Sequence, residues 1–549
     1  MLYYLHERGV IVVNVLAVTP FGAIFEIHSR SSYFCANGEY EIYLNDRLFV
    51  KTDKNVVSLM GLTPDTYYDV VVKGYFCDDD IYFSFETLRP DYIINVKDYG
   101  AKGDGETVDT AAINLAVYTA PVSATVYFPK GVYLVHQILL KSGVDIYLEK
   151  GATVIQSTKR NELAIVKGYE RSYDHIDAEV NSTWEGNPLD SYSSLLYGKG
   201  IKDVHIYGEG MLNGNGEASG FWHNPGVKNA AYRPKNILLV DSVNVQISGL
   251  KSVNSASWNI HLFGCDDVSL RALTILSDEE SPNTDGISPE CCHSVEIIGC
   301  RFSVGDDCIT VRAGKYYMSV KHRKPTRAVT IRNCLMEKGQ GAVTIGSEMS
   351  CGVYGIDVSQ CLMRDTSRGL RVKTMRGRGE HGVVDGVTFQ NIVMERVKHC
   401  FVINMFYNCD LDGKSDYVRS KNIRPFDEFT PSVKNIWLIN VNATDIFGCA
   451  VFVYGLPESK VNQILIRDSN FTFAPPAKRV HECPDMMDDF ETIKNMGFFI
   501  ENASEVIISN NTAAGRCVNH AGTRIRKWPT GEYYTDGSGL ECGISFSGA

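Results

Sequence analysis

Short runs in which apolar and polar residues alternate fill the first 90 residues of the chain. Turn-forming residues separate the runs at intervals of about ten residues, and a period of two is typical of strands that bury one face. Several short strands at this spacing predict a β-sandwich. We therefore expect residues 1–90 to form a small all-β domain, with strands at residues 11–18, 22–29, 40–46, 55–62, 67–75 and 81–87.

One turn of this region carries a recognisable motif. The stretch from Leu62 to Tyr68, with Pro64 and Thr66 between them, resembles the LxPxTxY corner of fibronectin type III domains. The resemblance implies that the Tyr68 hydroxyl bonds to nearby backbone. It also implies a domain that positions or spaces its neighbour. We expect residues 88–91 to form the linker.

A heptapeptide of the form x-apolar-x-apolar-x-x-x recurs through the rest of the chain. Successive copies lie 23 to 49 residues apart. This base period suits one turn of a parallel β-helix, with the longer gaps marking loop insertions. We therefore predict a β-helix over residues 91–549, with a helix at 107–120 (N-cap Asp109 or Thr110) covering its open first coil. The copies are residues 203–209, 244–250, 267–273, 294–300, 328–334, 355–361, 386–392, 435–441, 463–469 and 505–511.

Composition excludes several classes of protein. Hydrophobic residues make up 44% of the 549 residues, which excludes global disorder. The net charge of −11 argues against nucleic-acid binding. The apolar run near the start is short and interrupted by Asn14, so we expect no membrane span. Glu7 and Arg8 precede this run and it has no small-residue cleavage site, so we expect no secretory signal. We expect a cytoplasmic protein; the sequence does not indicate its oligomeric state.

The sixteen cysteines do not indicate a disulfide scaffold or a metal site. No CxxC pair occurs, and Cys300, Cys334 and Cys361 recur at the seventh heptapeptide position. We expect reduced, buried thiols that form an interior ladder, and we expect neither a metal nor a cofactor.

A second strand follows each repeat, and alignment of these strands locates carboxylates. Stacking them by their inward apolar positions places Asp285 and Asp307 two residues before the first such position on adjacent coils. Neighbouring strands lie about 4.8 Å apart, so these carboxylates should be close. Asp306 precedes Asp307, and Gln340 falls on the Asp306 rung one coil later. The outward positions on this face are His261, Ser288, Glu290, Thr310, Arg312, Thr344, Arg371 and Lys373.

The charge of this region favours an anionic substrate. Residues 312–378 contain 14 Lys/Arg and 4 Asp/Glu, whereas the remaining chain is strongly acidic. Clustered aspartates raise one another's pKa, so one of them stays protonated near neutral pH. A protonated acid beside a carboxylate that activates water is the apparatus of glycoside hydrolysis, and Arg or Lys would bind a sugar carboxylate.

Four motifs in this order resemble glycoside hydrolase family 28, the polygalacturonase-like right-handed parallel β-helices. They are NTDG at 283–286, GDD at 305–307, GQGAVTIGSEMS at 339–350 and RVK at 371–373. The DYGAKGDG stretch at 98–105 resembles the opening of many β-helix proteins. The resemblance implies a right-handed solenoid that hydrolyses galacturonic acid linkages in pectin-derived oligosaccharides.

The family's roles transfer to matching positions. The resemblance implies that Asp306 is the general acid, that Asp285 and Asp307 hold and deprotonate water with inversion, and that Arg371 and Lys373 contact the substrate carboxylate. Gln340 stands where the family has a histidine, and an amide cannot titrate. Gln340, His261 and Arg312 complete the candidate substrate contacts; a buried structural role is the alternative for His261.

Several functional alternatives stay open. The stretches 345–353 and 454–458 resemble the bacterial exo-acting branch, and insertions after Ala313 and Tyr407 would close one end of the cleft. Gln340 leaves open a rhamnogalacturonan-directed enzyme. A pectate-lyase-like elimination with calcium and a non-catalytic glycan-binding β-helix are the other possibilities.

Overall fold

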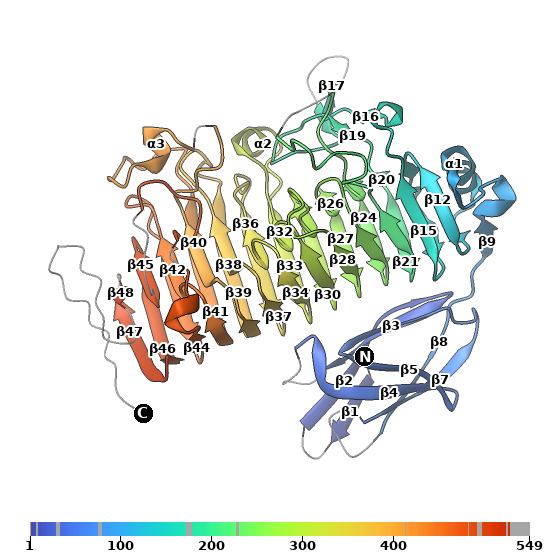
Figure 1. Cartoon of the computed structure of the whole chain (residues 1–549), viewed down its shortest axis with the longest axis horizontal. Coiled ribbons are helices and arrows are strands. Elements are labelled where there is room, and N and C mark those ends of the chain that lie inside the picture. Colours follow the sequence, from blue (N-terminus) through green and yellow to red (C-terminus); the bar gives the residue numbers. More distant parts are fainter. Residues whose placement is uncertain are drawn as a thin grey trace.

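The computed structural model describes residues 2–6, 9–28, 33–74, 80–171, 178–226, 230–411, 413–480, 482–490, 497–522 and 525–527. A small β domain lies beneath one end of a long solenoid (Figure 1). The last strand of the small domain ends at Glu86, and the first strand of the solenoid begins at Tyr92.

Two four-stranded antiparallel sheets form the N-terminal domain, in the orders β1-β2-β3-β6 and β5-β4-β7-β8. Six of the strands were predicted. The strands β1 and β5 were not, and β5 follows a tight turn at Asn45 and Asp46, both with positive φ. The Tyr68 hydroxyl accepts a hydrogen bond from the Thr63 backbone N–H at 3.0 Å, as predicted. The strands are β1 Leu2–His6, β2 Gly9–Thr19, β3 Gly22–His28, β4 Cys35–Leu44, β5 Arg47–Lys54, β6 Val56–Met60, β7 Tyr67–Lys73 and β8 Ile81–Glu86.

The predicted heptapeptides all lie in one large, mainly parallel sheet of 24 strands that winds along the solenoid. Its strands are β9 Tyr92–Asn95, β10 Asp104–Val108, β11 Ala124–Phe128, β12 Gly131–Val135, β14 Val144–Leu148, β15 Ala152–Gln156, β21 Lys202–Gly208, β22 Met211–Asn213, β24 Val243–Ser248, β25 Lys251–Val253, β27 Asp266–Arg271, β28 Thr274–Leu276, β30 His293–Ile298, β31 Arg301–Val304, β33 Thr326–Arg332, β34 Leu335–Lys338, β36 Val353–Ser359, β37 Leu362–Arg364, β39 Val383–Glu395, β41 Ser432–Ile446, β43 Asn462–Arg467, β44 Asn470–Phe473, β46 Val506–Ala513 and β47 Arg516–Gly522.

A second sheet of twelve strands closes the other side of each coil and carries the candidate site residues. Its register is the one predicted: Ile260 pairs with Ile287, and Ile287 pairs with Ile309. The strands are β13 Ile138–Leu139, β20 Leu196–Lys199, β23 Ile237–Val240, β26 Ile260–Phe263, β29 Ile287–Glu290, β32 Ile309–Val311, β35 Val343–Ile345, β38 Arg368–Lys373, β40 His399–Asn404, β42 Val451–Tyr454, β45 Phe498–Glu501 and β48 Ile525–Lys527.

The solenoid interior is a continuous apolar core. Inward side chains of successive coils stack on one another, which removes them from water along the whole length. The thiols of Cys300, Cys334 and Cys361 are free and fully buried in this stack, as predicted.

The first coil is covered by α1 (Thr110–Thr119), close to its predicted position (Figure 1). Ile113, Ala116 and Val117 of α1 are buried against the core. Asp109 precedes α1, but its carboxylate accepts hydrogen bonds from the backbone N–H groups of Lys102 and Gly103 and makes none to the helix.

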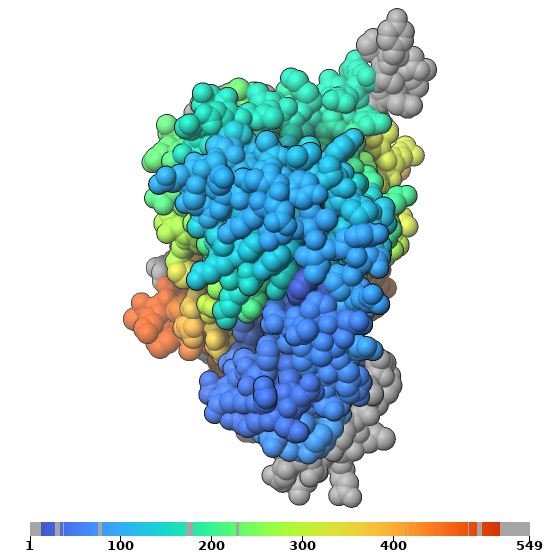
Figure 2. Space-filling model, turned by 90° about the vertical axis from the view of Figure 1, so that its right-hand side faces the viewer, coloured from blue at the N-terminus to red at the C-terminus, as the bar shows by residue number. Residues whose placement is uncertain are grey.

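The N-terminal domain packs on the outer face of the 24-stranded sheet, below the capped end (Figures 1 and 2). Phe21 stacks on Tyr147 with ring centroids 4.4 Å apart. Glu26 is fully buried and accepts two hydrogen bonds from Arg332, each 2.9 Å long, and one from Asn333. Burial alone would raise the pKa of Glu26, but the hydrogen bonds and charge of Arg332 hold it below its ordinary value.

Insertion loops cover the outer face of the twelve-stranded sheet, on the opposite side from the N-terminal domain (Figure 1). Among the described residues, no helix is both long and apolar enough to cross a membrane. The loops contain α2 Tyr316–Lys321, α3 Asp416–Arg419, the 3₁₀ turns η2 Arg160–Glu162 and η3 Pro476–Lys478, and the short strands β16 Ile165–Val166, β17 Tyr169–Arg171, β18 Ala178–Val180 and β19 Ser191–Tyr192; η1 Val96–Tyr99 lies at the domain junction.

Candidate active site

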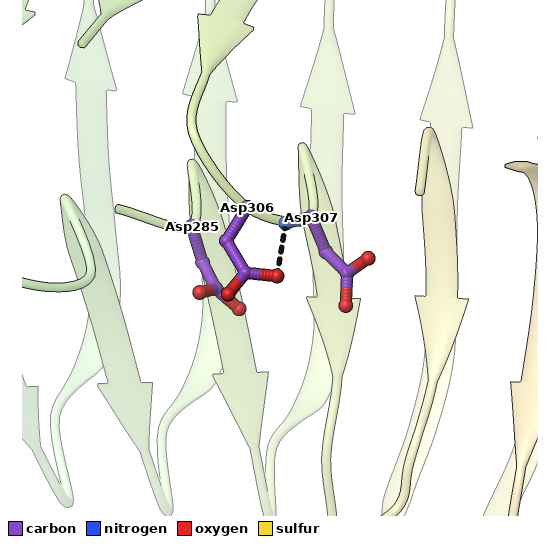
Figure 3. A group of neighbouring side chains, drawn as sticks. All are labelled: Asp285, Asp306 and Asp307. Carbon is purple, nitrogen blue, oxygen red and sulfur yellow. Dashed lines mark hydrogen bonds between the residues drawn. The ribbon is translucent and has the colours of Figure 1, made fainter. Parts of the chain in front are cut away.

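Asp285, Asp306 and Asp307 converge where the chain enters β29 and β32 (Figure 3). An oxygen of each lies within 4.8 Å of an oxygen of both others. Asp285 and Asp307 occupy equivalent rungs, because each lies two residues before the paired Ile287 and Ile309. The predicted carboxylate cluster is therefore present in the fold.

The chain bends at Gly305 and Asp306, outside any strand, so the two neighbouring aspartates need not point apart. Gly305 does not have a positive φ. A Cβ there would lie 2.1 Å from the carbonyl oxygen of Ser281, so close approach of backbone requires glycine. The Asp306 carboxylate accepts a hydrogen bond from the Asp307 N–H at 2.9 Å (Figure 3).

Two cations hold Asp307. Its Oδ2 lies 3.1 Å from Lys373 Nζ, and its Oδ1 lies 3.3 Å from a terminal nitrogen of Arg371. Lys373 and Arg371 come from β38, two coils further along the solenoid. Burial works to raise the pKa of Asp307, but the charges of Lys373 and Arg371 prevail and lower it to about 2. Asp307 is therefore ionised at any physiological pH.

Asp285 is held by Arg312. Its Oδ2 accepts hydrogen bonds from Arg312 and from the Thr310 hydroxyl, both at 2.7 Å. The other arm of Arg312 bonds to Glu348 at 2.7 Å. Burial raises the pKa of Asp285, the positive charge of Arg312 lowers it, and the negative charge of Asp307 raises it. The net result is a pKa above the ordinary value.

Asp306 has no cation bound to it among the described residues; its side-chain partner is Asn283, whose amide donates to Oδ2 at 3.3 Å. Burial, and then the negative charges of Asp285 and Asp307, raise the pKa of Asp306 to about 7. A carboxyl group whose pKa lies near neutral pH, beside the ionised carboxylate of Asp307, matches the division into acid and base that glycoside hydrolysis needs.

The three aspartates open into a cavity with a volume of about 210 Å³. This is smaller than the roughly 300–1,000 Å³ of typical small-molecule pockets. Insertion loops supply part of its wall, including Glu185, Tyr407 and Met486. Contacts join these loops to one another: Lys315 Nζ lies 2.9 Å from Asp410, and Asn408 donates to Asp488 at 2.7 Å. The cavity is lined by Glu185, Trp258, Asn283, Asp285, Asp306, Asp307, Arg312, Gln340, Ser347, Glu348, Arg371, Lys373, Tyr407, Cys409 and Met486.

Most of the predicted substrate contacts line this cavity, but His261 does not. Gln340 is exposed to the cavity, and its backbone N–H donates to the Asp306 carbonyl, which places it on the predicted rung. His261 is fully buried beneath Thr183, and its Nε2 lies 3.0 Å from Glu290. Burial lowers the pKa of His261 to about 4. His261 is therefore inaccessible to a substrate in this cavity, and the structural alternative fits.

Sequence reasoning missed several residues that the loops bring to the site. Asp485 bonds to Arg371 at 2.6 Å, both side chains being buried, and Met486 lines the cavity beside it. Arg371 lies 5.5 Å and Lys373 5.2 Å from the centre of the Tyr407 ring. Asp485, Met486 and Tyr407 lie outside the repeats, so the alignment of strands gave no signal for them.

Comparison with known proteins agrees with this arrangement. Residues 120–454 match the model of glycosyl hydrolases family 28. The chain belongs to this family. It is 29% identical to a probable polygalacturonase of Vitis vinifera over 70% of this chain and 75% of that one. It is 26% identical to an exo-poly-alpha-D-galacturonosidase of Dickeya chrysanthemi over 68% of each chain.

Solved structures support the fold of this family 28 protein. A hyperthermoactive exopolygalacturonase of Thermotoga maritima superposes with a TM-score of 0.65 at 24% identity, covering 79% of this chain and 95% of that one. A family 28 exopolygalacturonase of Yersinia enterocolitica gives the same TM-score at 18% identity, covering 92% of this chain and 95% of that one. The right-handed parallel β-helix and the glycoside hydrolase assignment are thus confirmed. The fibronectin resemblance stays a prediction.

Proposed function

We propose that this family 28 hydrolase removes galacturonic acid from the ends of pectin-derived oligosaccharides, with inversion at the anomeric carbon. The observation that carries the proposal is the convergence of Asp306, which pairs with no cation among the described residues, and two cation-held carboxylates in one small cavity. Asp306 protonates the departing glycosidic oxygen. Asp285 and Asp307 orient a water molecule and take up its proton.

Inversion is supported by how Asp307 is held. Both of its oxygens are engaged by cations, and a carboxylate in this state is a poor nucleophile, so water is the better attacking group. The distance between the carboxyl groups does not support inversion. Oxygens of the three aspartates lie within 4.8 Å of one another, closer than the roughly 6.5–9.5 Å typical between the carboxyl groups of inverting enzymes.

Attack at a chain end is supported by the loops. The insertions after Ala313 and Tyr407 meet at the ion pair of Lys315 and Asp410, and the segment that contains Asp488 joins them through Asn408. A cavity walled in this way suits one terminal sugar and leaves little room for a polymer to continue on that side.

Product formation from polygalacturonate tests the mode of attack. We expect reducing ends to accumulate while viscosity falls only slightly, with one short product from the start of the reaction. An early collapse of viscosity with a ladder of oligomers would refute attack at chain ends.

Two alternatives have distinct signatures. A rhamnogalacturonan-directed activity, suggested by Gln340 at the family's histidine position, predicts faster cleavage of rhamnogalacturonan fragments than of oligogalacturonides. The three clustered aspartates could instead hold calcium for a lyase-like elimination. Elimination predicts loss of activity with a chelator and products that absorb in the ultraviolet, and we expect neither.

A further inference from the structure

A second pocket, with a volume of about 250 Å³, adjoins the catalytic cavity. The two share Glu185 and Asn283, so a second sugar linked to the one in the cavity reaches this pocket. Its other walls come from insertion loops and include Arg160, Trp184, Phe221, His223, Tyr232 and Arg233.

The distribution of charge differs between the two pockets. In the catalytic cavity, the cations Arg312, Arg371 and Lys373 each lie within 3.3 Å of a carboxylate of the protein. In the second pocket, neither Arg160 nor Arg233 has a carboxylate within 4.0 Å among the described residues. The positive charge available to a ligand is therefore in the second pocket.

Arg160 is the more available of these two arginines. Its Nε donates to the Ser219 carbonyl at 2.7 Å, and its guanidinium lies 4.2 Å from the centre of the Phe221 ring. Its two terminal nitrogens make no hydrogen bond to the described residues, which leaves four N–H donors in a planar fork for a carboxylate.

Arg233 connects this pocket to the chemistry. It is buried, and it donates to the carbonyls of Ala256 and Pro282 and to Asn283 Oδ1 at 2.5 Å. Asn283 in turn donates to the Asp306 carboxyl. A sugar in this pocket therefore lies beside the group that protonates the glycosidic oxygen, as the partner sugar across the scissile bond must.

The aromatic wall gives this pocket a fixed shape. Trp184 stacks on Trp258 with ring centroids 5.2 Å apart and an interplanar angle of 5°, and on Tyr232 at 5.1 Å. Trp258 also lines the catalytic cavity, so one aromatic stack runs from one pocket to the other. The guanidinium of Arg233 lies 5.3 Å from the centre of the Trp184 ring, and that of Arg312 lies 4.3 Å from the Trp258 ring, so the stack helps to fix both arginines in place.

We propose that this second pocket is the subsite for the adjoining galacturonate and that Arg160 binds its carboxylate. The proposal rests on the proposed function and names what selects the second sugar. A neutral or esterified sugar at this position would lose the bidentate contact. The enzyme is then selective for two consecutive galacturonates with free carboxylates, although its catalytic cavity holds only one of them.

A thermodynamic cycle tests this subsite. The substrates are α-1,4-digalacturonate and its two isomeric monomethyl esters, and the proteins are the wild type, Arg160→Gln and Lys159→Gln. For the ester whose methylated ring lies in the second pocket, we expect wild-type kcat/KM to be about 10- to 100-fold lower than for the diacid. We expect Arg160→Gln to lower kcat/KM for the diacid by a similar factor and to cleave that ester as fast as the diacid.

Lys159→Gln is the matched control, because Lys159 is the adjacent exposed cation, pairs with Glu162 and lies outside the pocket. We expect it to discriminate as the wild type does, and Arg160→Lys to recover part of the lost discrimination. Equal cleavage of diacid and both esters by the wild type, or undiminished discrimination by Arg160→Gln, would overturn the subsite and leave the proposed function intact. A wild type that cleaves none of these galacturonides would overturn both.

Discussion

Replacing the general acid should stabilise the protein while it abolishes activity. The pKa of Asp306 is raised from 3.8 to about 7 in the folded protein. An acid whose pKa is raised on folding does not change the free energy of unfolding below its unfolded pKa. As pH rises from that value towards the folded pKa, it destabilises the folded protein by a growing amount. Three pKa units correspond to about 4 kcal/mol of unfolding free energy. Because Asp306 is partly exposed, we expect Asp306→Asn to recover about half of this, about 2 kcal/mol.

The assay is urea unfolding of the wild type and Asp306→Asn at pH 4, 5.5 and 8. The two proteins should be nearly equal at pH 4, and the variant should gain stability up to about pH 7 and keep it above. Asp307→Asn is the matched control of opposite sign: its carboxyl has a pKa lowered to about 2, and its loss leaves Lys373 and Arg371 without that partner. It should be destabilised at pH 8. A stability gain for Asp306→Asn that is the same at every pH would refute the reasoning.

Three further predictions concern the charges around the site and the domain interface. Lys373→Met should move both limbs of the pH profile of kcat/KM upward by about one unit, because Lys373 lowers the pKa of all three aspartates; unchanged limbs would contradict this. Asp485→Asn should lower KM for digalacturonate about fivefold, since it removes a negative charge beside Arg371 but keeps a hydrogen-bond acceptor; a raised KM would show that the charge itself positions Arg371. Glu26→Gln should lower the free energy of unfolding by about 2–3 kcal/mol and leave kcat unchanged, because it weakens the interface far from the cavity. Equal unfolding midpoints for wild type and variant would rule that out.

The repeats made most of the solenoid predictable from the sequence. Each strand of a β-helix pairs in register with the strand of the neighbouring coil. Aligning the inward apolar positions therefore recovers the register, and this alignment placed Asp285 and Asp307 at equivalent positions of adjacent coils. Asp306 followed from its position beside Asp307. Arg371 and Lys373 alternate with inward residues of the same strand, which fixed the face on which they lie.

Closure of the site was less predictable because it depends on irregular loops. The alternation of side chains correctly placed His261 on the outer face, but Thr183 and its neighbours, inserted between β15 and β20, cover that part of the face. Asp485 reaches Arg371 from 114 residues away, and no periodic pattern marks such a contact. The cations of the cavity are paired with carboxylates of the site itself and, for Arg371, also with Asp485 of such a loop, which the local excess of Lys and Arg did not reveal.

In the proposed mechanism, Asp306 donates the proton while Asp285 and Asp307 activate water. Following digalacturonate hydrolysis by ¹H NMR is the most direct test of this division of roles. For the wild type we predict that the first signal of the newly formed reducing end is the β-anomer, with no unsaturated sugar. For Asp306→Asn we predict a rate at least about 100-fold lower. A first product in the α configuration, unsaturated signals, or full activity of Asp306→Asn would contradict this mechanism.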